Sequence, residues 1–146
     1  MLSDSELESA RIHGVFSSAL AAEEAVYRLN LKQRFQGEWD LLLSFGCLQM
    51  LSLDSNQVAD VPESIGNLTQ LRSLGLGDNQ LTDVPESIGN LTQLQTLDLR
   101  SNQLTDLPES IGNLTQLQWL NLRGNPIPVQ RRAAIQALLP NTVIMW

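Results

Sequence analysis

The ten residues PESIGNLTQL occur at 62–71, again at 85–94 and a third time at 108–117. Each copy starts 23 residues after the one before it. A fixed period of about 20 to 50 residues is the signature of a repeat architecture, in which each repeat is one structural unit stacked on its neighbours. This stretch therefore decides how the rest of the chain is interpreted.

Aligned by this period, the chain reads LQMLSLDSNQVADVPESIGNLTQ at 48–70, LRSLGLGDNQLTDVPESIGNLTQ at 71–93 and LQTLDLRSNQLTDLPESIGNLTQ at 94–116. A fourth copy begins as LQWLNLRGNPIP at 117 and then departs from the pattern. The LxxLxL part alternates apolar and other residues, which is the period of a strand with one buried face. Strands 23 residues apart are too distant for hairpins, so we expect them to stack in parallel as successive turns of a coil.

The second half of each repeat predicts an arc that returns the chain to the next strand. Proline moves the preceding residue out of the α region and fixes its own φ. The glycine of each PESIG segment permits a sharp exit. We therefore expect extended chain and then a short turn of helix, with Ile65 and Leu68 pointing inward.

Between strand and arc, every regular repeat has an asparagine. Its side chain both donates and accepts hydrogen bonds, so it can satisfy the backbone groups of a turn inside the coil. We predict a structural asparagine ladder that bonds from turn to turn, formed by Asn56, Asn79, Asn102 and Asn125.

The pattern LxxLxLxxNxLxx(L/V)PxxIxxLxx resembles the 23-residue typical class of the leucine-rich repeat family, and the match runs without a gap over residues 48–127. The resemblance implies an α/β fold: a right-handed solenoid with a curved parallel sheet on its concave side and irregular or 3-10 arcs on its convex side. It also implies helical caps at both ends and a role in binding other proteins, as in most members of the family.

The whole chain, 1–146, is expected to form one domain. Residues 1–25 predict a helical N-terminal cap that begins with the capping-box pattern SDSE. Residues 26–47 look like a degenerate first repeat, without the asparagine or the proline, and 48–127 hold the regular repeats. Residues 128–146 predict a C-terminal cap: a helix ended by Pro140 and then a last strand, with Ile144 and Trp146 pointing inward.

Composition narrows the classes of partner and compartment. The formal net charge is −7 and the pI is about 4.5, which argues against nucleic acid or an anionic membrane as the partner. Cys47 is the single cysteine, so the chain cannot form an internal disulfide. The acidic start MLSDSELESA lacks the features of a secretory signal. These features favour the cytoplasm, whereas a leader removed from the chain would instead indicate secretion.

The copies differ mainly along one predicted face. Copies 71–93 and 94–116 differ at six positions, namely Arg72/Gln95, Ser73/Thr96, Gly75/Asp98, Gly77/Arg100, Asp78/Ser101 and Val84/Leu107. Five of these lie on or beside the predicted strand, where side chains face solvent on the concave side. Two explanations remain open: a surface shaped for a partner, or exposed positions that drift after duplication. Exposed convex positions such as Glu63 and Gln70 did not drift, which favours the first.

We therefore predict that the concave face binds a partner. Tryptophan and arginine are the residue types most enriched at binding hot spots, and both lie in the C-terminal half of this face. Trp119 is expected to be an apolar anchor, with Arg100 and Arg123 beside it contacting acidic or carbonyl groups. The alternative is that Trp119 packs against the C-terminal cap and shields the core. The predicted binding residues are Met50, Ser52, Asp54, Arg72, Ser73, Asp98, Arg100, Trp119, Asn121 and Arg123.

The size of the face limits the kind of partner. A sheet of this many strands is ~25 Å wide and its exposed face offers roughly 400 Å², half of the ~800 Å² that a standard interface takes per partner. We therefore predict a non-enzymatic interaction module for a peptide, a loop or a weakly bound protein. The alternative is a structural scaffold protein that associates weakly with itself.

Other patterns are interpreted as structural. The column Asp60, Asp83 and Asp106 is expected to cap the short turns that follow it. The NLT tripeptides match a glycosylation acceptor, but their leucine is a core position. No spacing of His, Cys, Asp or Glu indicates a catalytic triad, a thiol pair or a metal site. The sequence thus predicts neither a cofactor nor a metal.

Overall fold

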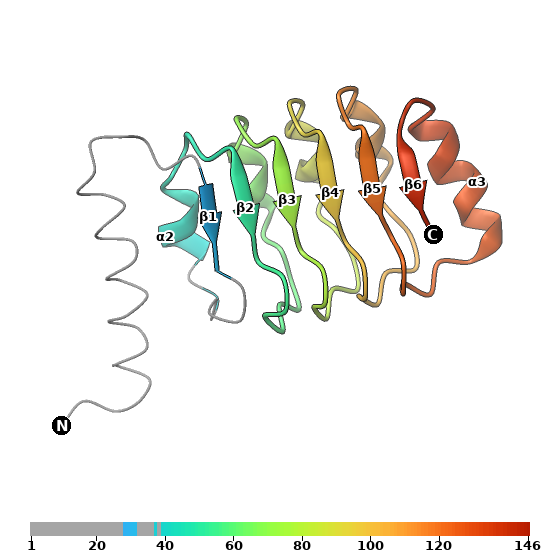
Figure 1. The fold of residues 1–146 in the computed structure, drawn as a ribbon, viewed down its shortest axis with the longest axis horizontal. Helices are drawn as coiled ribbons and strands as arrows, with labels where there is room; N and C mark the ends of the chain where they lie inside the picture. The colour runs from blue at the N-terminus through green and yellow to red at the C-terminus, as the bar shows by residue number, and fades with distance from the viewer. Residues whose placement is uncertain (1–27, 32–36, 38) are drawn as a thin grey trace.

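The computed structural model describes residues 28–31, 37 and 39–146. The predicted N-terminal cap at 1–25 lies outside the described residues, as does most of the loop of the degenerate first repeat. Within the described part, the chain winds into successive turns that each contribute one strand to the same sheet (Figure 1).

The strands are parallel and pair strictly in chain order from β1 to β6. The register follows the repeat, because Met50 pairs with Ser73, Ser73 with Thr96, and Thr96 with Trp119. The predicted stacking of strands is therefore confirmed for the regular repeats. The strands are β1 Arg28–Asn30, β2 Met50–Ser52, β3 Ser73–Gly75, β4 Thr96–Asp98, β5 Trp119–Asn121 and β6 Val143–Met145.

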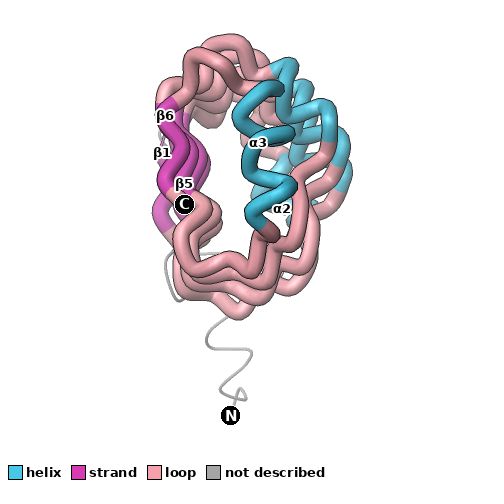
Figure 2. Tube along the Cα trace, turned by 90° about the vertical axis from the view of Figure 1, so that its right-hand side faces the viewer, coloured by secondary structure: helices cyan, strands magenta, loops and turns pink. Residues whose placement is uncertain are grey.

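The opposite wall consists of short helices, as the view along the solenoid shows (Figure 2). Each regular repeat has a 3-10 helix directly after its proline: η1 Glu63–Asn67, η2 Glu86–Asn90 and η3 Glu109–Asn113. The first repeat has an α-helix here, α2 Trp39–Leu43, and the C-terminal segment has α3 Val129–Leu138. Neighbouring 3-10 helices contact each other, and α3 packs against η3.

The expectation that Asp60, Asp83 and Asp106 cap these turns is wrong. The capping position is the proline itself, with ψ near 150°, and no side-chain hydrogen bond caps the helix. Proline suits this position because its missing N–H is a donor that the first helical turn would leave without a partner. Asp106 instead accepts a hydrogen bond from the adjacent N–H of Leu107 and pairs with Arg131 of α3 at 2.7 Å.

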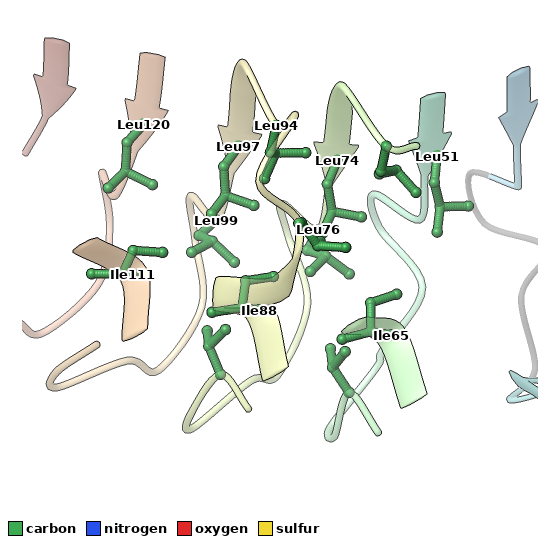
Figure 3. Close-up of a cluster of buried hydrophobic side chains, with 14 of the residues drawn as sticks. Leu51, Ile65, Leu74, Leu76, Ile88, Leu94, Leu97, Leu99, Ile111 and Leu120 are labelled. Carbon is green, nitrogen blue, oxygen red and sulfur yellow. The ribbon is translucent and has the colours of Figure 1, made fainter. Parts of the chain in front are cut away.

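The core fills the space between the sheet and the 3-10 helices (Figure 3). In each regular repeat, the leucines of the strand segment and the isoleucine of the 3-10 helix are at most 2% exposed. Burial of one such side chain stabilises the fold by about 1.5–3 kcal/mol. The repeated pattern therefore builds one continuous apolar column: Leu51, Leu53, Ile65, Leu74, Leu76, Ile88, Leu97, Leu99 and Ile111.

The glycines of the PESIG segments have a different role from the predicted one. A Cβ on Gly66 would lie 2.7 Å from the backbone oxygen of Ser87, and one on Gly89 would lie 2.6 Å from that of Ser110. Neither glycine is among the residues with positive φ. Glycine is needed at Gly66 and Gly89 because neighbouring 3-10 helices approach too closely for a side chain, and not because the chain turns sharply. At Gly112 a Cβ would meet its nearest atom, the backbone oxygen of Leu138, at 3.4 Å, which is an ordinary contact.

The C-terminal segment contains the predicted helix and strand. Ile135 and Leu139 are buried, and Ile144 and Trp146 are partly buried against the core. The guanidinium of Arg132 lies 5.4 Å from the centre of the Trp146 ring, within the range of a cation–π contact. That this segment seals the end of the solenoid remains a prediction.

Candidate binding face on the sheet

The asparagines lie inside the turn that follows each strand, and their side chains hold neighbouring turns together. Asn79 Nδ2 donates to the carbonyls of Leu53, Leu76 and Gly77 at 3.0–3.1 Å. Its Oδ1 accepts from the N–H groups of Asn56 and Val58 at 3.0 and 2.9 Å. Asn102 and Asn125 repeat this arrangement with the backbone of the turn before them. The ladder thus runs from side chain to backbone, and it fixes the end of each strand.

One feature of these turns was not predicted from the sequence. The residue before each asparagine has a positive φ: 60° at Ser55, 54° at Asp78, 51° at Ser101 and 74° at Gly124. This left-handed conformation costs most residues about 1–2 kcal/mol. Only Gly124, and more weakly Asp78, carries a sequence signal for it, whereas the serines do not.

A groove of about 450 Å³ runs across the exposed face of the sheet. Six of the predicted binding residues line it: Met50, Ser52, Asp54, Ser73, Asp98 and Trp119. Asn30, Gly75 and Thr96 contribute as well, although they were not among the predicted residues. Arg72, Arg100, Asn121 and Arg123 do not line the groove.

Asn121 differs from the expectation of an exposed side chain, since it is only 6% exposed. It lies in register between Asp98 of β4 and Met145 of β6, so the sheet continues on both sides of it. Its Oδ1 accepts a hydrogen bond from the N–H of Arg123 at 3.2 Å. Asn121 therefore supports the end of β5.

The side chain of Arg100 is bound within the molecule. Its guanidinium pairs with Asp98 and, at 3.1 Å, with Asp78 of the preceding turn. The side chain passes over Gly77, where an added Cβ would lie 3.1 Å from Arg100 Cγ. The carboxylate of Asp98 is the main cause that raises the pKa of Arg100. The pKa of Asp98 is itself raised, because burial outweighs the effect of Arg100. Arg100 is thus a member of an internal ion-pair cluster.

The floor of the groove is held by hydrogen bonds between polar side chains and backbone. Ser52 Oγ donates to Asp54 Oδ2 at 2.9 Å, and the N–H of Gly77 donates to Asp54 Oδ1 at 2.8 Å. Thr96 Oγ1 donates to Ser73 Oγ at 2.8 Å across two strands. These bonds orient the side chains without a ligand, which lowers the entropic cost of binding.

Trp119 lies at the C-terminal end of the groove. It is partly buried and pairs in register with Thr96 of β4 and Val143 of β6. Val143 is 60% exposed beside it. Arg72 and Arg123 are exposed, and neither side chain forms an ion pair with another residue that the structure describes.

The part of the chain that the structure describes contains neither a candidate metal centre nor a candidate membrane span. No group of three or more His, Cys, Asp or Glu residues there could hold a metal ion. No helix in the same part has the length and apolar character needed to cross a membrane.

The chain belongs to the leucine-rich repeat family: the model of a leucine-rich repeat region matches residues 29–138, three quarters of the chain. The fold is accordingly a leucine-rich-repeat solenoid, and the family indicates a repeat module for protein interaction. No curated protein sequence matches the chain.

Two solved structures illustrate the similarity. A leucine-rich-repeat protein of Leptospira interrogans has 39% identity and a TM-score of 0.72, over 73% of this chain and 27% of that protein. An internalin of Listeria monocytogenes has 26% identity and a TM-score of 0.61, over 82% of this chain and 40% of that protein. The chain therefore spans well under half the length of either protein.

Proposed function

We propose that the chain is a non-enzymatic interaction module that binds an extended peptide or loop of another protein in the groove across its sheet. The observation that supports this most is the coincidence of the groove with the variable columns of the repeat. Ser73/Thr96 and Gly75/Asp98 differ between copies, and all four residues line the groove. The residues that hold the turns together do not vary in this way.

The dimensions of the groove favour a peptide over a folded partner. A volume of about 450 Å³ accommodates a few side chains, in the range of small ligand sites. Leucine-rich repeats use their concave surfaces for binding, and the floor here is already ordered. A peptide in extended conformation would lie across the strands. We also propose a cytoplasmic location, where the exposed thiol of Cys47 stays reduced.

Selection from a randomised peptide library displayed on phage tests this function. Peptides selected on the wild-type protein should bind the Trp119→Ala variant at least tenfold more weakly, because Trp119 lines the groove. Glu86→Ala, on the convex side, is the matched control and should bind them normally. Selected peptides that bind the Trp119→Ala variant as tightly as the wild-type protein would refute binding in the groove. Light scattering that shows a concentration-dependent oligomer would favour self-association instead.

A further inference from the structure

The charge of the groove identifies the chemistry of its ligand. Among the residues that line it, the charged ones are Asp54 and Asp98, and both are acidic. Asp78 lies close by and Arg100 is the cation that pairs with it and with Asp98. Three carboxylates against one guanidinium leave a local net charge of −2. The groove is therefore complementary to a cation.

Asp54 has capacity for a further donor. Its two oxygens accept from Ser52 Oγ and from the N–H of Gly77, which are both neutral donors. A carboxylate has about four lone-pair sites, so two remain. No described cation forms an ion pair with Asp54. A bound guanidinium or ammonium group would supply the missing opposite charge, and a charge-assisted hydrogen bond is about twice as strong as a neutral one.

Gly75 allows the carboxylate of Asp54 to lie directly over β3, in the groove. It pairs in register with Ser52 on one side and Asp98 on the other. A Cβ on Gly75 would lie 3.0 Å from both carboxylate oxygens of Asp54. The carboxylate of Asp54 therefore occupies the space that a side chain on Gly75 would fill, and it lines the groove there, where a long basic side chain can contact it.

Apolar side chains from β2 and β5 line the groove. Met50 on β2 is 38% exposed and Trp119 on β5 is partly buried. Three strand spacings of ~4.8 Å separate them, about 14 Å in all. An extended peptide rises ~3.4 Å per residue, so residues i and i+4 of a peptide across the strands match this span. Residue i+2 then points to the same face, midway between the two anchors.

We propose that the groove recognises an extended peptide in which an arginine or lysine is flanked, two residues away on each side, by apolar residues. The basic side chain pairs with the Asp54 carboxylate over Gly75, with Asp98 on the next strand, and the apolar residues contact Met50 and Trp119. This proposal rests on the proposed function and specifies its ligand. It replaces the sequence-based expectation of an acidic partner, because Arg100 is engaged by Asp98 and Asp78.

The test uses the peptides selected from the phage library on the wild-type protein and dependent on Trp119. They should be enriched in arginine or lysine between two apolar residues. For a synthetic copy of one such peptide, replacing the basic residue with glutamine should weaken binding about tenfold, or ~1.4 kcal/mol. Asp54→Asn should weaken the original peptide by a similar factor and the glutamine peptide hardly at all. Binding of the original peptide should also weaken with added salt.

Asp83→Asn is the matched control, because it removes the same charge from an exposed residue outside the groove and should leave affinity unchanged. Asp98→Asn gives a second variant within the site, and thermal melting verifies that each variant folds. Trp119-dependent peptides that lack a basic residue, or that carry an acidic one, would overturn this inference and leave the proposed function standing. A library without Trp119-dependent peptides would overturn both.

Discussion

Asn79→Ala should destabilise the protein by about 3 kcal/mol. The substitution removes five hydrogen bonds, three donated by Nδ2 and two accepted by Oδ1. Val58 is buried, so its N–H would lose its partner where water does not readily replace it. One unsatisfied buried group costs about 1–3 kcal/mol. The carbonyls of Leu76 and Gly77 keep another donor each, from Asn102 Nδ2 and the N–H of Ser55, so the total stays near the upper end of that range.

Thermal unfolding followed by circular dichroism measures this effect. For a domain of this length, 1 kcal/mol shifts Tm by about 2–4 °C, so the expected decrease is about 6–12 °C. Asn125→Ala should have a smaller effect, since three side-chain bonds are lost there and the residue is only partly buried. Asn67→Ala is the control, because Asn67 is exposed on η1 and the change should be within about 0.5 kcal/mol.

The decreases in Tm of the three variants together distinguish the loss of buried hydrogen bonds from other causes of lower stability. Equal decreases for Asn79→Ala and Asn67→Ala would mean that helix propensity or the unfolded state dominates, and not the buried bonds. A Tm for Asn79→Ala within about 2 °C of wild type would refute the ladder as a source of stability.

Four further outcomes are expected. Gly89→Ala should cost about 1–3 kcal/mol because its Cβ would lie 2.6 Å from a backbone oxygen, whereas Gly46→Ala, with nothing within 4 Å of its Cβ, should be nearly neutral; equal melting temperatures would contradict this. Trp119→Ala should weaken peptide binding by roughly 2 kcal/mol and lower Tm only slightly; a large loss of Tm would instead favour its packing under the C-terminal segment. Deletion of residues 143–146 should lower Tm sharply, since it exposes the edge of β5 and uncovers Leu120 and Leu122; an unchanged melting curve would refute the sealing role. The pKa of Asp98 is raised in the folded state, so its contribution to stability is present below the unfolded value of 3.8 and is lost as pH rises through the folded value. The Asp98→Asn variant should therefore gain stability relative to wild type from acid to neutral pH. A constant difference in stability across that range would contradict the sign.

The period of the sequence predicted most of the fold, because each repeat uses the same inward positions. Strand register, the inward leucines and the place of the turns follow from the 23-residue spacing alone. The first repeat is the exception: it lacks the proline, and its arc contains α2 in place of a 3-10 helix. A pattern that is absent from the sequence could not predict that geometry.

The site was predicted less completely, because its properties depend on contacts between adjacent turns. The repeat shows which side chains face the solvent, but not which of them bind each other. Arg100 was expected to face a partner, and its engagement by Asp78 depends on a contact between residues 22 positions apart. Asn121 was expected on the same face, yet it is only 6% exposed. The left-handed serines 55 and 101 had no sequence signal at all.

The residues that differ between copies complement one another in size across neighbouring turns. This pattern helps to decide whether the exposed face has drifted since duplication. The side chain of Arg100 crosses Gly77, and the carboxylate of Asp54 lies where a side chain on Gly75 would begin. Each glycine thus stands next to a longer side chain from a neighbouring turn. Free drift at exposed positions would not place small residues selectively beside large ones. The same arrangement places the carboxylate of Asp54 over Gly75, in the groove that Asp98 also lines. The variation that distinguishes one copy from the next therefore shapes a single acidic groove, and so it favours a surface selected for a partner over one released from constraint.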